Sequence, residues 1–298
     1  YTQWHSTKQE EKGGSRTGRL SSTPNLQNVP SDERWEEANN RFIPLRKKYP
    51  WAKDLPHGRG YVISPKGYVL LGRDYSQQEM RVLAHFEDGD LCGAYKKDPR
   101  MDIYIFGVEV VQKMTGVLLH PDPKFARKIM KTVILSLMYG LGVGRLAERL
   151  EISVVDAKRF KDAILKALPG IKLLIRDLQD LGRAGRPLTT WGGRRYYAEP
   201  SRVVNGRLQE YFYKLINYLI QSSSADITKE AMVRYEERKV HGELLLTVHD
   251  ELVVLCPREH YRTEMKILQE TMDGIPLDAP LVTDGFIGTN WGELRDYK

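Results

Sequence analysis

The spacing of apolar positions changes along the chain. Short apolar runs at 61–63 and 68–71 flank a Pro-Lys-Gly turn and predict two strands joined by that turn. From Met80 onward, apolar residues recur three and four positions apart, which is typical of amphipathic helices. This spacing predicts helices over 80–86, 103–114, 125–139, 146–150, 155–168 and 171–181.

Strand signals return in the last third of the chain. A glycine pair within 187–197 predicts a hairpin. The pattern over 208–238 predicts a long helix. Apolar runs at 244–248 and 252–255 predict two more strands, and a helix is expected over 259–272. Because lone hairpins are only marginally stable, we expect the strands on both sides of the helical middle to form one sheet. The predicted fold class is therefore α+β.

Composition limits the classes of protein. The chain has 298 residues, 41% hydrophobic and 29% charged, which is ordinary for a globular protein. No apolar stretch approaches the roughly 18 residues that a membrane helix needs. Two cysteines, Cys92 and Cys256, exclude a disulfide framework and a four-cysteine zinc site and favour a reducing compartment. The net charge of +7 admits a nucleic-acid partner without establishing one.

Acidic residues stand at the ends of apolar runs. Asp74 follows one predicted strand, and Asp250 and Glu251 lie between two others. Aspartate is a favoured turn residue, so an ordinary turn is one interpretation. However, hairpin turns prefer Asn-Gly or Asp-Gly, whereas this one has adjacent negative charges and no glycine. The alternative is a divalent-cation site, because carboxylates from two strands can hold two ions about 3.5–4 Å apart for phosphoryl transfer.

A basic stripe marks the predicted helix over 125–139. Arg127, Lys131, Leu135 and Tyr139 recur every four residues, so they lie along one side of that helix. A solvated helix face is one interpretation of this pattern. The other is a nucleotide site, in which two cations one turn apart grip phosphates and the tyrosine stacks on a base.

Six segments, in this order, resemble the motifs of family A DNA polymerases, the group of bacterial DNA polymerase I and its bacteriophage relatives. The resemblance covers the chain from about Thr17 to Trp291 and implies a right-hand polymerase palm, an antiparallel sheet with helices, that carries a helical fingers insertion. The segments are 17–22 with 24–28, 74–81, the group Arg127, Lys131 and Tyr139-Gly140, the group Asn217, Gln221 and 225–227, 249–251, and Asn290-Trp291.

The resemblance implies a DNA-directed DNA polymerase, which adds dNMP from dNTP to a primer 3′-hydroxyl in the 5′-to-3′ direction. Asp74 and Asp250 would bind two Mg²⁺ ions, which Mn²⁺ could replace, with help from the backbone carbonyl of Tyr75. Glu251 would be a nearby catalytic carboxylate of lesser importance. Primer–template DNA and dNTPs are the implied partners, and no membrane is involved.

The resemblance also assigns binding roles. Glu79 resembles a steric gate against the ribose 2′-hydroxyl, Arg127 and Lys131 would hold the triphosphate, and Tyr139 would close over the nascent base pair. The residues expected at the dNTP are Arg127, Lys131, Leu135, Tyr139, Glu79, Gln77 and Tyr104. The residues expected at DNA are Arg19, Asn25, Gln27, Arg81, Gly140, Arg194, Arg195, Asn217, Gln221 and His249; for Arg194 and Arg195 a solvated pair is the alternative.

Four features depart from the family pattern. Leu135 replaces an aromatic residue at the position that governs dideoxynucleotide discrimination. Tyr104 stands where a histidine often touches the triphosphate, and Tyr213 stands where an arginine is common. Residues 8–15 resemble an insertion into the first palm loop.

We expect the palm at 1–95 and 187–298 and the fingers at 96–186, with the thumb and the 3′–5′ exonuclease domain absent from this chain. The expectation is a fragment of a longer polymerase or a split polymerase whose partner chain supplies these parts. A non-catalytic primer–template-binding subunit and a single-subunit RNA polymerase are the alternatives. The expected location is the cytoplasm of a bacterium or of a phage-infected cell, with an organelle as the alternative, and the departures favour a phage-like protein.

Overall fold

The computed structural model describes residues 3–5, 15–23, 29, 58–204 and 206–297. The chain divides into two compact units, which are described separately below. Unit 1 comprises 1–76, 228–275 and 281–298, and unit 2 comprises 77–227 and 276–280. Compact units need not coincide with functional subdomains, so the palm and fingers boundaries stay a prediction.

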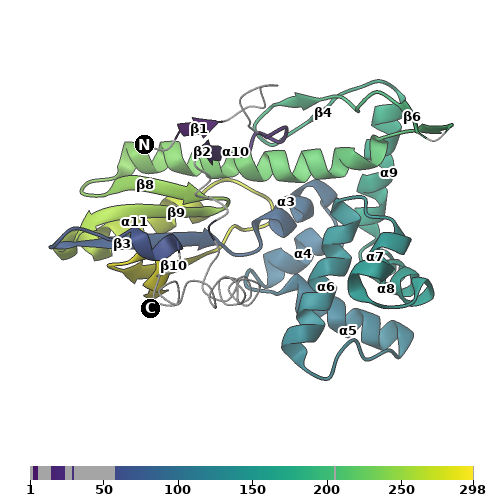
Figure 1. The fold of residues 1–298 in the computed structure, drawn as a ribbon, viewed down its shortest axis with the longest axis horizontal. Coiled ribbons are helices and arrows are strands. Elements are labelled where there is room, and N and C mark those ends of the chain that lie inside the picture. Colours follow the sequence, from purple (N-terminus) through teal and green to yellow (C-terminus); the bar gives the residue numbers. More distant parts are fainter. Residues whose placement is uncertain (1–2, 6–14, 24–28, 30–57, 205, 298) are drawn as a thin grey trace, which may run out of the picture. The chain divides into compact units, whose positions relative to one another are not determined.

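Unit 1 is built on an antiparallel five-stranded sheet in the order β11-β10-β3-β9-β8 (Figure 1). Strands from both sides of the helical middle therefore form one sheet, as the sequence predicts. A separate short pair, β1 and β2, is also antiparallel. The strands of unit 1 are β1 (Gln3–His5), β2 (Ser21–Thr23), β3 (Tyr68–Tyr75), β8 (Glu243–Val248), β9 (Glu251–Pro257), β10 (Thr283–Gly288) and β11 (Arg295–Asp296).

The central strand β3 is apolar because both of its faces are covered. Helix α11 (Tyr261–Asp273) packs on one face, where the Tyr75 hydroxyl donates to the Met272 carbonyl. On the other face, Leu70 joins a buried cluster with Val253 and Trp291. Short 3₁₀ helices η3 (Gly58–Tyr61), η5 (Arg258–His260) and η6 (Trp291–Glu293) complete the unit. Asp74 lies on the same face as Leu70, since side chains two apart share a face.

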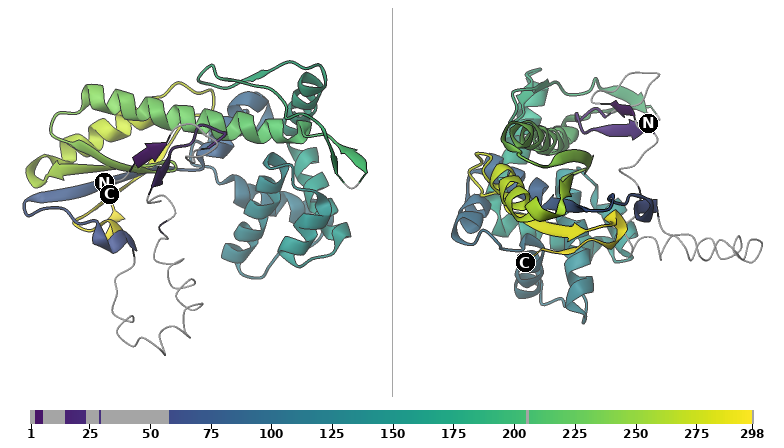
Figure 2. Two further views of the ribbon diagram at one scale, coloured as in Figure 1. Left: turned by 45° about the horizontal axis from the view of Figure 1, so that its top comes forward. Right: turned by 90° about the vertical axis from the view of Figure 1, so that its left-hand side faces the viewer.

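Unit 2 is mainly helical (Figures 1 and 2). Helix α5 begins after Asp102, whose carboxylate accepts from the backbone N–H groups of Tyr104 and Ile105. Helix α6 begins after Asp122 with a proline at its first turn, which is a strong start signal. The helices are α3 (Gln78–Glu87), α4 (Asp90–Lys97), α5 (Ile103–Thr115), α6 (Pro123–Met138), α7 (Val143–Leu150), α8 (Val154–Ala167) and α9 (Pro169–Arg183). The helices predicted over 80–181 are thus confirmed.

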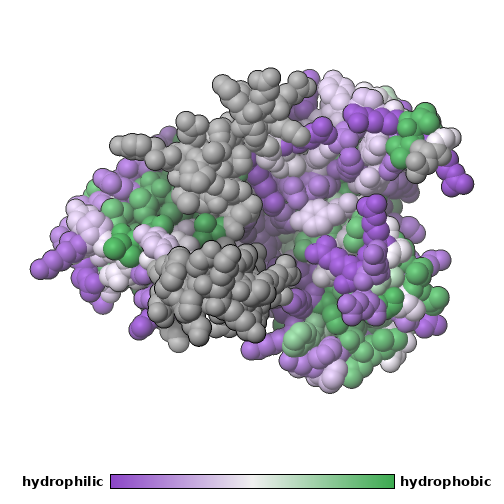
Figure 3. All heavy atoms as spheres, viewed as in Figure 1, coloured by the Kyte–Doolittle hydropathy of each residue, from purple (hydrophilic) through white to green (hydrophobic). Residues whose placement is uncertain are grey.

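Two hairpins belong to unit 2. Strands β4 (Leu188–Thr189) and β5 (Arg195–Tyr196) form the hairpin predicted at 187–197. Strands β6 (Arg202–Val204) and β7 (Arg207–Gln209) form a second one. Its exposed Val203, Val204 and Leu208 account for the green patch over β6 in the hydropathy view (Figure 3).

Helix α10 (Leu215–Arg238) belongs to both units, because the division falls between residues 227 and 228. It is buried at most positions along its first half, including Ser222, Ser223 and Ser224. None of the helices within the described ranges is long and apolar enough to cross a membrane.

Two predicted elements are wrong. Residues 61–63 do not pair with 68–71; Tyr61 ends η3, and Ile63 forms an isolated bridge to Asn290. Both edges of β3 are occupied by β9 and β10, so no edge is left for this segment.

The helix predicted from 208 begins instead at Leu215. Gly206, with φ of +74°, turns the chain so that Leu208 pairs with Val203 in the β6–β7 hairpin. A turn residue with positive φ overrides the apolar spacing there, because glycine reaches that conformation at little steric cost.

Candidate active site

Asp74 is surrounded by acidic residues in unit 1. It lies near the end of β3, directly opposite Glu251 on β9 and Asp284 on β10. Asp250 is adjacent as well, because the Tyr75 backbone N–H donates to its carbonyl oxygen at 3.4 Å. The fold therefore brings Asp74 together with Asp250 and Glu251, although Asp74 is far from these two in the sequence.

This arrangement raises the pKa of Asp74 to about 8. The largest cause is the partial removal of the carboxyl group from water, followed by the negative charges of Asp250, Glu251 and Asp284. Arg59 acts in the opposite direction. Like charges directly opposite each other destabilise a sheet, so a bound cation would relieve a cost built into this site.

Glu251 has its own partners. Its Oε2 lies 3.7 Å from Arg59 Nη1, and its Oε1 accepts from Trp291 Nε1 at 3.4 Å. The Arg59 guanidinium also lies over the Trp291 ring, 4.5 Å from its centroid. Burial nevertheless raises the pKa of Glu251 above its ordinary value. These contacts hold Glu251 toward the apolar cluster and fit the secondary role expected for it.

The turn between β8 and β9 consists of His249 and Asp250. His249 has φ of +60°, a left-handed conformation that is uncommon outside glycine. Glu251 is already the first residue of β9. The strained turn fixes the position of Asp250 next to β3.

The oxygen donors of unit 1 fit a hard cation such as Mg²⁺. Mg²⁺ is commonly bound by one or two carboxylates together with water and substrate phosphates. Asp74 and Asp250 supply that number, and a bound cation would favour the ionised form of Asp74, whose pKa burial and the neighbouring negative charges raise. In the part of the chain that the structure describes, no three His, Cys, Asp or Glu residues form a group that could hold a metal ion by themselves.

The predicted nucleotide-binding residues lie in unit 2. Arg127, Lys131, Leu135 and Tyr139 follow the less buried side of α6 and its C-terminal end, opposite the buried Met130, Val133, Ile134 and Leu137. The Tyr139 hydroxyl donates to Glu79 Oε2 at 3.2 Å. The structure thus brings the predicted steric gate and the predicted base-pair cover together within this unit.

Tyr104 lies at the beginning of α5, and Arg127 on α6 contacts this helix end. Arg127 forms an ion pair with Asp102, with 2.7 Å between Nη2 and Oδ2. Tyr104 is only 5% exposed, so it packs in the core of unit 2. Its expected direct hydrogen bond to a triphosphate is therefore not supported; its ring instead lies beneath Arg127 and Lys131.

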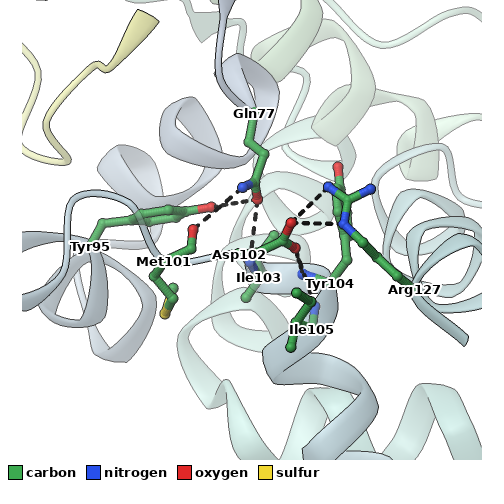
Figure 4. A network of polar contacts seen from close by, with 8 residues as sticks. All are labelled: Gln77, Tyr95, Met101, Asp102, Ile103, Tyr104, Ile105 and Arg127. Atoms are coloured by element: carbon green, nitrogen blue, oxygen red, sulfur yellow. Dashed lines mark hydrogen bonds and ion pairs between the residues drawn. The ribbon is translucent and has the colours of Figure 1, made fainter. Parts of the chain in front are cut away.

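Gln77 and Arg81 have partners inside unit 2. The Gln77 amide contacts Met101, Tyr95 and Ile103 (Figure 4). Arg81 is fully buried, and its guanidinium donates to the carbonyl oxygens of Pro99 and Pro280. Its side chain has no exposed surface for DNA, so the expected DNA contact of Arg81 is not supported. Motif position alone did not indicate that this arginine satisfies buried carbonyl groups.

Gly140 ends the predicted fingers motif in a left-handed conformation, with φ of +61°. A Cβ atom at this position would collide with the ring of Tyr213. The close approach explains the glycine, and it gives Tyr213 a packing role at the position where an arginine is common.

The remaining predicted DNA contacts differ in their surroundings. Arg194 forms an ion pair with Asp226 and donates to the Ser222 carbonyl at 2.9 Å, whereas Arg195 on β5 is exposed. Asn217 and Gln221 lie one turn apart on α10, and Asn217 Oδ1 is buried with no hydrogen-bond partner among the described residues. Such an atom is available to a ligand donor.

Arg19 is half-buried in unit 1, and Asn25 and Gln27 lie outside the described residues, as does most of the insertion expected at 8–15. Arg59 and Asp284 were not predicted from the sequence, because their roles depend on strand pairing. No local pattern marks either residue, since each becomes significant only as a neighbour of Asp74 or Glu251.

Comparisons with known proteins identify the family of this chain. The sequence model described as DNA polymerase family A matches residues 2–293. DNA polymerase I of Helicobacter pylori (strain ATCC 700392 / 26695) is 34% identical over 292 residues, which is 95% of this chain and 30% of that protein. Thermostable DNA polymerase I of Thermus aquaticus is 31% identical over 286 residues, which is 94% of this chain and 32% of that protein.

A solved structure is also similar. It is the POL domain of Pol1 from M. smegmatis in complex with DNA primer-template and dNTP, with a TM-score of 0.76 and 28% identity. The similarity covers 98% of this chain and 48% of that one. This chain spans about a third of the length of the curated relatives that it matches. With nearly its whole length matched by the family's sequence model, the chain belongs to DNA polymerase family A.

Proposed function

We propose that this chain carries out template-directed DNA synthesis, adding dNMP from dNTP to a primer 3′-hydroxyl by a two-metal-ion mechanism. The observation that carries the proposal is the row of acidic residues across β9, β3 and β10, with Asp250 beside it. A row of like charges destabilises the free protein, and it suits a site whose charge is completed by cations and phosphates.

In this proposal, Asp74 and Asp250 hold the cations, helped by the Tyr75 backbone carbonyl, and Glu251 acts as a nearby carboxylate. When bound, the two metal ions would lower the pKa of the primer hydroxyl and stabilise charge on the α-phosphate and the leaving pyrophosphate. The protein contributes by keeping both aspartates fixed on a strand end and a tight turn. Mg²⁺ is the proposed ion, with Mn²⁺ as a substitute.

Unit 2 would bind the incoming nucleotide. Arg127 and Lys131 would neutralise charge on the triphosphate. Glu79 would exclude the ribose 2′-hydroxyl, and its contact with Tyr139 supports this role by fixing the carboxylate. Leu135 lies on the same helix face and would contact the nucleotide through apolar surface only.

Several residues are proposed to contact primer–template DNA. The unpartnered Oδ1 of Asn217 supports a minor-groove contact, with Gln221 one turn away. Arg195, which is exposed, is a better phosphate ligand than Arg194, which is paired with Asp226. Arg19, Gly140 and His249, with Asn25 and Gln27, complete the proposed DNA contacts.

The relatives are longer than the matched region. We therefore include in the proposal that a thumb, and a 3′–5′ exonuclease where one is used, come from further polypeptide in the same chain or in a partner. The cytoplasm of a bacterium or of an infected cell is the proposed location.

Primer extension tests the proposal. Asp250→Asn should lower the rate of nucleotide incorporation by roughly 10³-fold or more, because one cation loses its charged ligand. Asp296→Asn removes a carboxylate from the exposed edge strand β11 and should leave the rate unchanged. An unaltered rate in Asp250→Asn would reject Asp250 as a metal ligand, whereas absence of incorporation by the wild-type chain would support a non-catalytic primer–template-binding subunit.

A further inference from the structure

Arg127 is held in place by Asp102. The Nε atom of the guanidinium donates to Asp102 Oδ2 at 2.7 Å, and Nη2 forms an ion pair with the same oxygen at 2.7 Å (Figure 4). Only two of the five N–H groups of an arginine are used in this way, so three remain outside the pair. The Arg127 side chain is 40% exposed and that of Asp102 is 22% exposed. The pair therefore fixes the guanidinium while leaving part of it accessible.

Asp102 is itself fixed by the helix that it begins. Its Oδ1 accepts from the backbone N–H groups of Tyr104 at 2.8 Å and Ile105 at 3.2 Å. One carboxylate oxygen thus caps α5, and the other holds Arg127. Because the cap is part of the backbone geometry of α5, the position of Arg127 is tied to a rigid helix end.

Gln77 fixes the residues on both sides of Asp102. Its Nε2 donates to the Met101 carbonyl at 3.3 Å, and its Oε1 accepts from the Ile103 backbone N–H at 3.3 Å and from the Tyr95 hydroxyl at 3.2 Å. Gln77 has φ of +56°, a left-handed conformation with a cost for a residue other than glycine. These three hydrogen bonds hold the backbone at Gln77 in its left-handed conformation.

The Tyr104 ring packs against both cationic side chains, Arg127 and Lys131. Its ring centroid lies 5.2 Å from Arg127 Cζ and 5.8 Å from Lys131 Nζ. Since Tyr104 is 5% exposed, the ring is a fixed surface against which both cations rest.

We propose that Asp102 is a positioning residue that orients Arg127 for the triphosphate of the incoming nucleotide, with Gln77 and Tyr104 as its supports. The inference rests on the proposed function. A free arginine side chain loses rotamer freedom when it grips a phosphate, whereas Arg127 has already lost much of it. The remaining N–H groups can bond to phosphate oxygens while the Asp102 carboxylate stays paired with Nε and Nη2.

The test is Asp102→Asn. The asparagine oxygen can still cap α5, but the charged partner of Arg127 is lost. In single-nucleotide incorporation at saturating primer–template, KM for dNTP should rise roughly tenfold and kcat should stay within about twofold, as expected when binding common to ground and transition states is lost. An unchanged KM, or a lower one because Asp102 competes with phosphate, would overturn the inference.

The rise in KM that is expected for Asp102→Asn must depend on Arg127. In an Arg127→Ala background, Asp102→Asn should raise KM no further, since the residue that it positions is gone. A second, independent rise in KM would contradict the proposal. Asp122→Asn is the matched control: Asp122 caps α6 through Lys124 and should leave KM unchanged. Asp102→Ser, which can also cap, replaces Asp102→Asn if thermal unfolding shows that the latter does not fold.

Failure of this inference can be distinguished from failure of the proposed function. Absence of incorporation by the wild-type chain rejects the function. Calorimetric titration of dATP into protein bound to a dideoxy-terminated primer–template measures the affinity for dATP without chemistry. It tests the inference whether or not the wild-type chain incorporates nucleotide. A roughly tenfold weaker affinity in Asp102→Asn supports it, and equal affinity rejects it.

Discussion

At the scale of single residues, environment gives similar side chains different roles. Arg81 and Arg127 are both arginines of the recognised motifs, but Arg81 satisfies buried carbonyl groups and Arg127 keeps exposed surface. Asp74 and Glu251 face each other on neighbouring strands, and the Glu251 carboxylate contacts Arg59 and Trp291. Motif position alone does not separate these roles, because partners decide them.

The raised pKa of Asp74 predicts a pH dependence of stability in the presence of a chelator. In the folded state the pKa is about 8, above the ordinary value of 3.8, so the folded state retains a proton that the unfolded state has lost. The free energy of unfolding should therefore fall as pH rises from about 4 to 8, by at most roughly 1.4 kcal/mol per pH unit.

Urea unfolding at several pH values measures this slope. Asp74→Asn should flatten it, and Asp296→Asn, on the exposed edge strand of the same sheet, should not. Saturating Mg²⁺ should also reduce the slope, because a bound cation takes the place of the proton. Stability that rises over this pH range in the wild-type chain would contradict the prediction.

Glu79→Ala should weaken discrimination between dNTP and rNTP. The carboxylate is held by Tyr139, and its removal opens space where a 2′-hydroxyl would lie. We expect the ratio of kcat/KM for dNTP over rNTP to fall by roughly tenfold or more. Glu109→Ala, an exposed glutamate on α5, is the control and should keep the ratio. An unaltered ratio in Glu79→Ala would show that another residue excludes ribose.

At the scale of elements, helix ends carry much of the site. Asp102 and Asp122 begin α5 and α6, and Gly140 follows the C-terminal end of α6. The helix boundaries predicted near 103 and 125 agree with these ends, because capping residues and prolines act locally. The strand predicted at 61–63 does not form, since both edges of β3 are already paired.

Gly140→Ala should be more damaging than Gly116→Ala. Both glycines have positive φ, +61° and +70°, but only at Gly140 does an added Cβ meet another residue, Tyr213. The left-handed conformation costs roughly 1–2 kcal/mol in each variant, and the collision adds to it at Gly140. Chemical denaturation compares the two variants, and Tyr213→Ala should restore part of the loss in Gly140→Ala. Equal losses in the two variants would contradict the packing role of Tyr213.

At the scale of the whole molecule, the chain carries 46 lysines and arginines against 39 aspartates and glutamates. If it binds primer–template mainly through phosphates, affinity should fall steeply with salt, because each phosphate contact releases counterions. Between 50 and 200 mM salt we expect a loss of roughly tenfold or more, with few nucleotides added per binding event by this chain alone. Fluorescence anisotropy and extension with an unlabelled DNA trap measure these quantities. Salt-independent binding or processive extension would contradict the prediction.

The sequence alone determined most of the helices, though not α4, the single sheet assembled from both ends of the chain, and the candidate residues of the site. Those features follow from apolar spacing, capping residues and motif order, which neighbouring residues specify. Only the tertiary structure decided that Asp284 and Arg59 lie beside the aspartates, that Arg81 and Tyr104 are buried, and that Asp102 holds Arg127. Register and side-chain partners depend on contacts between distant segments, and no local pattern encodes them.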